Sequence, residues 1–173
     1  MAATGLNYGD IDALGLAELV RSKQVSPIEL VDDAIARCEE VNGALNAVIT
    51  EMFEHARAQA KLSLGDGQFA GVPFLMKDFV AEVAGFPFYE GSDFLNGYVP
   101  KEDSETYRRF SHAGLITIGK TNLPEFAIGV TTEPRRFGPT HNPWDTARTP
   151  GGSSGGAAAA VAARIVPMAH GND

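Results

Sequence analysis

The sequence feature that most constrains this chain is a run of small residues near its C-terminal end. Two serines, Ser153 and Ser154, are enclosed by glycines at positions 151, 152, 155 and 156, and residues 157–163 are alanine except for one valine. Glycine permits backbone conformations that other residues adopt only at a cost, whereas alanine is the best helix former. The run therefore predicts a tight turn that presents serine hydroxyls and leads directly into an alanine-rich helix.

Length and charge limit the classes of protein to consider. A chain of 173 residues can bury a core of its own and form one domain. The formal net charge is −8 at pH 7. This acidic balance argues against nucleic acid or an anionic membrane as a partner, because both are bound by clustered lysine and arginine side chains.

Cysteine content and the absence of targeting signals favour a cytoplasmic protein. Cys38 is the single cysteine of the sequence, so no internal disulfide can form, which fits a reducing compartment. Residues 1–7 lack the basic and apolar segments of a signal peptide, and no apolar run approaches the ~18 residues of a membrane span. Cys38 lies at helical spacing with apolar neighbours, so we expect it in the core rather than as a reactive thiol.

Helix-like and strand-like segments alternate along the chain, which predicts an α/β fold with a largely parallel sheet and no linker between domains. The clearest helix start is Ser26-Pro27-Ile28-Glu29, where Ser26 and Glu29 can form a capping box. We expect Asn42-Gly43 to end that helix. Other helices are expected after Asp10 or Asp12 and over residues 52–64, 102–113 and 123–128, and strands over residues 45–50, 71–78, 115–120 and 165–169.

The residues alone leave several interpretations of the serine turn open. A Gly/Ser linker would not usually run into an alanine-rich helix. A phosphate-binding loop would need a lysine where Ala157 stands. Residues 152–156 fit the G-x-S-x-G pattern of a nucleophile elbow with Ser154 as nucleophile, but no apolar strand precedes them, and only His170 follows, ahead of Asp173.

A further interpretation is a serine that is activated by a lysine. Lys77 ends the apolar segment 71–78, where a charged side chain has no packing reason to be. Burial disfavours the ammonium form and would leave a neutral amine that can act as a base. The alternative is a strand-end lysine in solvent, and both remain open. Asp78 need not neutralise Lys77, because successive strand residues point to opposite faces.

Four segments resemble, in collinear order, the motifs of the amidase signature hydrolases. They are Gly71 to Asp78, similar to G-x-P-x-x-x-K-D; Gly119 to Phe126, similar to G-K-T-N-x-x-E-F; Gly138 to Asp145, similar to G-x-x-x-N-P-W-D; and Gly151 to Ala163, which resembles the signature itself. The resemblance covers essentially the whole chain. Within the family the chain looks most similar to bacterial amidases of the 6-aminohexanoate (nylon oligomer) cyclic-dimer hydrolase type, partly on residues 130–134 and 168–173.

The resemblance implies a mixed central sheet flanked by helices, of which this chain holds only the N-terminal portion. We expect a single incomplete domain, with residues 1–66 mainly helical and residues 67–173 forming the start of the signature core. The resemblance also implies a Ser–cis-Ser–Lys triad. Lys77 falls on the catalytic lysine, and Ser153 falls on the bridging serine, whose peptide bond to Gly152 is expected to be cis. Ser154 and Gly155 belong to the same active-site turn.

The activity that the resemblance implies is hydrolysis of the C–N bond of a linear or cyclic carboxamide through an acyl-enzyme. The family's nucleophile is a third serine in a D-x-G-G-S run. Asp173 matches the aspartate of that run, so the nucleophile is expected just beyond it, and this chain alone is expected to be inactive. No metal or cofactor is implied. Gly129, Val130 and Thr131 are expected to bind substrate through their backbone, and Lys120, a rival base, falls in a structural segment.

Two other functions stay open. One is a non-catalytic fragment, or half of a split protein, that binds a complementary chain. The other is an amidotransferase A-type subunit that releases ammonia from glutamine, although residues 130–134 favour a stand-alone amidase. The expected partners are a small amide substrate and the C-terminal remainder of the same protein, with a homodimer also considered; no nucleic acid and no membrane is expected.

Overall fold

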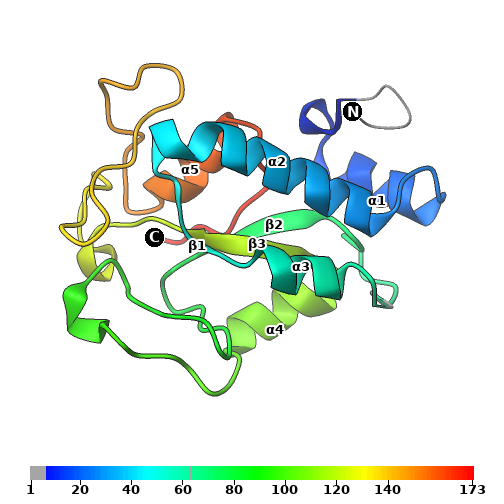
Figure 1. Ribbon diagram of the computed structural model, residues 1–173, viewed down its shortest axis with the longest axis horizontal. Coiled ribbons are helices and arrows are strands. Elements are labelled where there is room, and N and C mark those ends of the chain that lie inside the picture. The colour runs from blue at the N-terminus through cyan, green and yellow to red at the C-terminus, as the bar shows by residue number, and fades with distance from the viewer. Residues whose placement is uncertain (1–6, 63) are drawn as a thin grey trace.

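A mixed three-stranded sheet lies at the centre of the fold (Figure 1). The structure, a computed structural model, describes residues 7–62 and 64–173. Strands β1 (Val48–Glu51), β3 (Ile116–Thr121) and β2 (Pro73–Lys77) are neighbours in that order. β2 and β3 run parallel, whereas β1 runs antiparallel to β3. The α/β class and the mixed sheet are confirmed, but the largely parallel sheet holds for one of the two strand pairs, because alternation along the chain does not set the direction of β1.

Helices cover both faces of this sheet. In Figure 1, α2 and α5 lie on one side of the strands and α4 lies on the other. Within the described residues, none of the helices is both long and apolar enough to cross a membrane. The helices are α1 (Ala13–Arg21), α2 (Pro27–Leu45), α3 (Phe53–Gln59), α4 (Glu105–His112) and α5 (Gly155–Ala162), with short 3-10 turns η1 (Tyr8–Asp10), η2 (Asp93–Leu95) and η3 (Glu125–Ala127).

The expected starts of α1 and α2 are confirmed by their caps, whereas α4 begins at Glu105 rather than at residue 102. Asp12 caps α1 by accepting a hydrogen bond from the amide of Gly15. Ser26 and Glu29 form the expected capping box at the start of α2. Ser104 caps α4 through the amide of Tyr107. Each cap satisfies an amide that the first helical turn leaves without a partner, so local sequence fixes these three starts.

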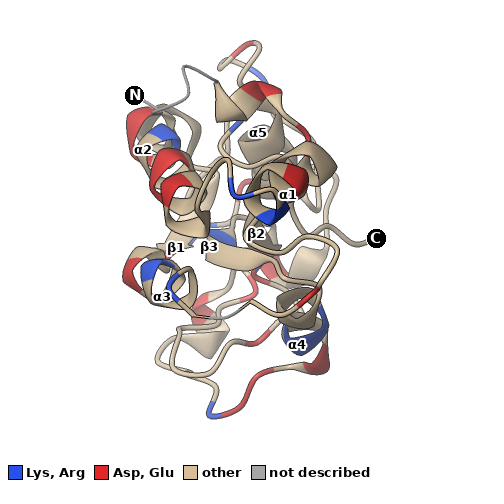
Figure 2. Ribbon diagram, turned by 90° about the vertical axis from the view of Figure 1, so that its right-hand side faces the viewer, with Lys and Arg blue, Asp and Glu red and all other residues tan. Residues whose placement is uncertain are grey.

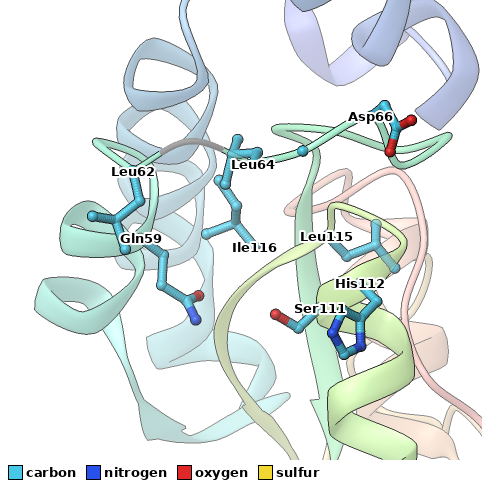
Figure 3. A pocket seen from close by; sticks show the side chains of 9 residues that line it. Gln59, Leu62, Leu64, Asp66, Ser111, His112, Leu115 and Ile116 are labelled. Atoms are coloured by element: carbon cyan, nitrogen blue, oxygen red, sulfur yellow. The ribbon is translucent and has the colours of Figure 1, made fainter.

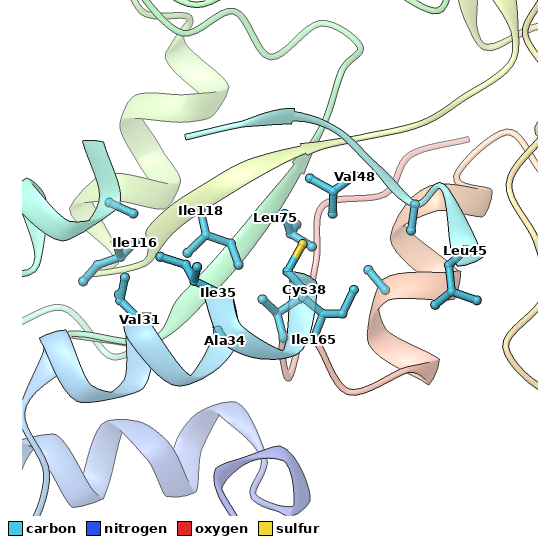
Figure 4. Close-up of a cluster of buried hydrophobic side chains, with 14 of the residues drawn as sticks. Val31, Ala34, Ile35, Cys38, Leu45, Val48, Leu75, Ile116, Ile118 and Ile165 are labelled. Atoms are coloured by element: carbon cyan, nitrogen blue, oxygen red, sulfur yellow. The ribbon is translucent and has the colours of Figure 1, made fainter. Parts of the chain in front are cut away.

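One face of the sheet packs against α2 and α5 through aliphatic side chains (Figure 4). Ile118 and Leu75 from the strands meet Ile35 and Cys38 from α2 in a continuous buried cluster. The acidic residues of α2, red in Figure 2, are exposed or half-buried, whereas its apolar stripe is buried against the sheet. Cys38 is buried in this cluster, which confirms its expected core role, and this burial raises the pKa of its thiol to about 12.

The opposite face of β2 packs against α4. Phe74 lies with its ring centroid 4.9 Å from that of Phe110, and Met76 belongs to the same buried cluster. All five residues of β2 are therefore buried, as are all six of β3. A parallel strand that is covered on both faces is typically a continuous apolar run. Because β2 is covered in this way, the lysine at its end lies in a water-poor environment.

The structure corrects the expected end of α2. The helix continues through Asn42 and Gly43 to Leu45, and Asn46 ends it in the left-handed conformation with φ 51°. The Asn42 side chain instead accepts hydrogen bonds from the amides of Ala47 and Val48. The strand therefore begins at Val48 rather than at residue 45, because a side-chain contact with the following strand replaces the turn that Asn42-Gly43 predicts.

Three other expected elements are shorter than predicted. α3 ends at Gln59 instead of residue 64, and residue 63 lies outside the described residues. The expected helix over residues 123–128 is a single 3-10 turn, since Phe126 and Ala127 adopt positive φ. The expected strand over residues 165–169 reduces to an isolated bridge between Ala169 and Leu75.

The alanine-rich helix α5 packs backbone against backbone. A Cβ atom placed on Gly156 would lie 2.5 Å from the amide nitrogen of Asn122 and 2.7 Å from the carbonyl oxygen of Ala47. The amide of Gly156 itself donates to the carbonyl of Asn122 at 3.2 Å. Only glycine fits this contact, so the glycine pair that precedes the alanines sets how closely α5 approaches the sheet.

Gly156→Ala is therefore expected to destabilise the chain by about 1–3 kcal/mol, because the new methyl group must displace backbone atoms. The matched control is Gly43→Ala in α2, where a Cβ atom meets nothing within 4 Å. This control should stabilise by about 0.5–1 kcal/mol through helix propensity. Urea unfolding followed by circular dichroism measures both changes, and equal effects of the two substitutions would contradict the packing argument.

Candidate active site

The end of β2 and the serine turn meet at the amine of Lys77. Its Nζ lies 2.8 Å from Ser153 Oγ, 3.0 Å from Ser154 Oγ and 2.6 Å from the side-chain oxygen of Asn172. Lys77 has 0% exposure, so a solvent-facing strand-end lysine is excluded. Ser153 and Ser154 are both half-buried. The sequence-predicted Lys77, Ser153 and Ser154 are thus in direct hydrogen-bond contact.

Two packing contacts bring these segments together. The parallel pairing of β2 with β3 extends to the last residue of β2, with Lys77 opposite Thr121. The C-terminal segment lies along the other edge of β2, where the amide of His170 donates to the carbonyl of Leu75 at 2.8 Å. α5 begins immediately after Ser154. The amine of Lys77 therefore lies between a rigid strand, a helix N-terminus and residues 170–173.

Burial lowers the pKa of Lys77, because the ammonium form loses its hydration. The carboxylate of Asp173 partly opposes this change by favouring the charged form. The start of α5 carries a partial positive charge, which also disfavours an ammonium group beside it. The balance moves the amine toward the neutral form, in which it can accept a proton from a hydroxyl group.

Asp78 and Lys120 form a separate buried ion pair. Lys120 Nζ lies 3.2 Å from Asp78 Oδ1, and both side chains have 0% exposure. Lys120 also donates to the carbonyl of Pro87 at 2.9 Å, and Asp78 accepts from the amide of Tyr89 at 3.0 Å. Burial raises the pKa of Asp78 and lowers that of Lys120, because lost hydration outweighs their mutual attraction. Asp78 is thus turned away from Lys77, as strand alternation predicts.

The serine turn is held by Thr132, a residue that the sequence reasoning missed. Thr132 Oγ1 donates to the carbonyl of Gly151 at 2.9 Å and accepts from the amide of Gly155 at 3.1 Å. The peptide bond between Gly152 and Ser153 is cis, as the resemblance implies. The signal that could have found Thr132 is its place directly after the predicted substrate-binding segment.

The predicted substrate-binding residues lie beside this turn. A Cβ atom on Gly152 would lie 2.7 Å from the carbonyl oxygen of Thr131, so the two backbones are in contact. Gly129 and Val130 are exposed next to it, and Val130 has 84% exposure. A binding role for these three residues stays a prediction.

The second missed residue is Asn172, which supplies the shortest contact to Lys77. Its backbone also engages Ser154: Ser154 Oγ donates to the carbonyl of Asn172 at 3.1 Å and accepts from its amide at 3.3 Å. Asp173 follows directly and adds its charge near Lys77. In the sequence, only its place next to Asp173 marks Asn172 as a residue near the site. Its contact with Lys77 is visible only in the structure.

A cavity of about 390 Å³ lies elsewhere, between α3 and α4 (Figure 3). Its lining includes Gln59, Leu62, Ser111 and His112, and it contains none of the sequence-predicted site residues. Among the described residues, no group of three or more His, Cys, Asp or Glu side chains is placed to hold a metal ion. This cavity is therefore separate from the Lys77 cluster.

Comparison with known proteins assigns the family. A family profile described as Amidase matches residues 29–173, which is most of the chain. The chain belongs to the amidase family. Its resemblance to the amidase signature motifs and its expected fold class are thereby confirmed.

The relatives it matches are about three times as long. The chain is 45% identical over 164 residues to the 6-aminohexanoate-cyclic-dimer hydrolase of Paenarthrobacter ureafaciens, across 94% of this chain and 33% of that protein. It is 43% identical to the A-type subunit of the glutamyl-tRNA(Gln) amidotransferase of Halothermothrix orenii, across 95% of this chain and 34% of that protein. A solved structure of 6-aminohexanoate cyclic dimer hydrolase superposes with a TM-score of 0.91 at 44% identity, over 97% of this chain and 35% of that one.

The Asp78–Lys120 pair is expected to be structural. Lys120→Met should destabilise the chain by about 3–5 kcal/mol, because it leaves the carboxylate of Asp78 buried without its partner. The double variant Asp78→Asn, Lys120→Met should be less destabilised, since it removes both charges, and the exposed Lys101→Met should change stability little. Urea unfolding of the three variants tests this, and a double variant less stable than Lys120→Met would contradict it.

Proposed function

We propose that the longer protein to which this chain belongs is an amidohydrolase, in which Lys77 and Ser153 relay a proton to and from a serine nucleophile. The observation that carries the proposal is the contact of 2.8 Å between Lys77 Nζ and Ser153 Oγ, made by a fully buried lysine. The substrate class is a linear or cyclic carboxamide, in keeping with the family.

The relay runs in two directions. Neutral Lys77 takes the proton of Ser153, and Ser153 takes the proton of the nucleophile as that serine attacks the amide carbonyl. In the reverse direction the relay protonates the amine that leaves. Water then hydrolyses the acyl-enzyme with the same two residues as base and bridge. The transfer between Ser153 and Lys77 runs along the hydrogen bond that already joins them.

The nucleophile is proposed to be the third serine of the family pattern, in the D-x-G-G-S run that Asp173 begins. The lowered pKa of Lys77 and the position of Asp173 beside it support this arrangement. The backbone amides of that run would stabilise the oxyanion, an effect worth about 3–4 kcal/mol per donor in other enzymes. Gly129, Val130 and Thr131 would contact the acyl part of the substrate.

Lys77→Ala and Ser153→Ala, introduced into the full-length protein, should each lower kcat for an amide substrate by about 10²–10⁴-fold, because each removes one proton carrier. The matched controls are Lys61→Ala and Ser111→Ala at exposed positions, which should leave kcat unchanged. Steady-state amide hydrolysis measures these effects. Near-normal turnover in either Lys77→Ala or Ser153→Ala would exclude the relay.

The 173-residue chain by itself is expected to hydrolyse no amide, because the proposed nucleophile is not among its residues. Product release from a chromogenic anilide, followed over hours with purified chain, tests this expectation. Turnover that Ser154→Ala abolishes would instead favour the nucleophile elbow, with Ser154 as the attacking group.

A second candidate is an amidotransferase A-type subunit. The 43% identity to such a protein favours it, and that value is close to the identity with the cyclic-dimer hydrolase. Both candidates use the same lysine and serine relay and differ in substrate. Ammonia release from glutamine by the full-length protein, compared with hydrolysis of cyclic amides, separates the two.

The partners follow from the same proposal. We propose that this chain packs against the C-terminal remainder of the same protein, because apolar side chains such as Ile128 (82%) and Val130 (84%) are exposed in the segment that leads to Thr131, which contacts the serine turn. A non-catalytic fragment that binds a complementary chain would use the same surface. A homodimer and a cytoplasmic location stay predictions from the sequence.

A further inference from the structure

We infer that Asn172 is a positioning residue that, together with Ser154, turns the lone pair of the Lys77 amine toward Ser153. The inference rests on the proposed role of Lys77 as the base. It goes beyond that role because it names the groups that orient the base. The donors and acceptors around Lys77 Nζ decide which way its lone pair points.

Three oxygen atoms make close contacts with Lys77 Nζ: Ser153 Oγ at 2.8 Å, Ser154 Oγ at 3.0 Å and Asn172 Oδ1 at 2.6 Å. The backbone carbonyl oxygen of Asn172 lies farther away, at 3.4 Å, and can only accept. An ammonium group has three N–H donors and can bind all three close oxygens. A neutral amine has two N–H donors and one lone pair. In the neutral form, one of the three close contacts must therefore reverse its direction.

Two of the three oxygens cannot reverse. The amide oxygen of Asn172 is an acceptor in every protonation state of the site. Ser154 Oγ already donates its proton to the carbonyl of Asn172 at 3.1 Å, and it accepts from the amide of Asn172 at 3.3 Å. Ser154 Oγ also accepts a hydrogen bond from an N–H of Lys77. The hydroxyl group then donates one hydrogen bond and accepts two, which is the most that a serine hydroxyl can make.

Ser153 is the group that is left to donate. Within the part of the chain that the structure describes, Lys77 is the hydrogen-bond partner of Ser153 Oγ, and no other contact holds its proton. The lone pair of neutral Lys77 must then face Ser153. This is the direction in which the base has to point before it can take the proton of the bridging serine.

The charges around the amine are consistent with this role for Asn172. Asp173 lies next to it and favours the ammonium form. Lys77 in turn contributes, with burial, to the lowered pKa of His170. Asp78 points to Lys120 instead. A neutral amide at position 172 thus supplies an acceptor without adding a second negative charge beside the base.

The first test uses the 173-residue chain and needs no activity. The pKa of Lys77 is measured by NMR titration of ¹³C-labelled lysine, with the signal assigned by its loss in Lys77→Met. Asn172→Asp keeps the shape and the acceptor but adds a charge, so the pKa of Lys77 should rise by about 1–3 units. Asn96→Asp adds the same charge on an exposed loop, where its side chain contacts Arg136, and should leave that pKa unchanged.

The second test uses the full-length protein. Asn172→Ala should lower kcat by about 10–100-fold with little change in KM, because the base loses one of the two acceptors that orient it. Asn172→Asp should move the rising limb of the pH–rate profile to higher pH and recover turnover there. A residue that only packs would tolerate the isosteric Asp without either change.

The outcomes separate the inference from the proposed function. If the unsubstituted full-length protein hydrolyses no amide, the proposed function fails, and the NMR titration still decides whether Asn172 contacts the amine. Equal pKa values for Lys77 in Asn172→Asp and Asn96→Asp overturn the inference. An unchanged pH–rate profile in Asn172→Asp overturns it as well, even where the enzyme is fully active.

Discussion

The burial of one amine is the constraint on which the site depends. Lys77 ends a strand that is covered on both faces, so its side chain cannot reach water. A buried ammonium group is costly unless hydrogen-bond acceptors surround it, and a neutral amine is the alternative. The fold supplies acceptors from the serine turn and from Asn172, which come from different segments of the chain. Their meeting at one nitrogen atom ties the turn to the strand.

Two lysines on adjacent strands show how partners decide a role. Lys77 and Lys120 are both fully buried, and both have pKa values lowered by burial. Lys120 is paired with the carboxylate of Asp78 and with a backbone carbonyl, so it has no hydroxyl group to deprotonate. Lys77 contacts two serine hydroxyls instead. The residue type is the same, and the chemistry follows from the neighbouring groups.

Local sequence was sufficient wherever a contact is local or a motif is complete. The caps at Ser26 and Ser104 satisfy amides three residues away, and the segment that ends in Lys77 reads as a buried strand. The failures come from tertiary contacts. Asn42 marks a turn by composition, but its side chain binds the amides that precede and begin β1, so the helix continues.

The same limit applies to the site. Composition gives no reason for Phe126 to leave the helical region; its amide donates to the carbonyl of Glu90, which belongs to a loop far away in the sequence. Thr132 and Asn172 likewise act through partners that are 19 and 95 residues distant in the chain, namely Gly151 and Lys77. Motif spacing identifies residues that carry chemistry, whereas residues that orient them appear only when the segments are placed in space.

The motif residues without chemistry of their own converge on Asn122. Its amide donates to the carbonyl of Ala47, its side chain donates to the carbonyl of Gly138 and to Thr140, and its carbonyl accepts from Gly156. Asn122 follows β3 directly, so it joins the sheet, the loop that holds Gly138 and Thr140, and the start of α5. Gly156 lies two residues after Ser154, so its hydrogen bond to Asn122 helps to fix the position of the serine turn relative to β2. The contact between Ser153 and Lys77 therefore depends on backbone packing at Asn122 as well as on the two side chains.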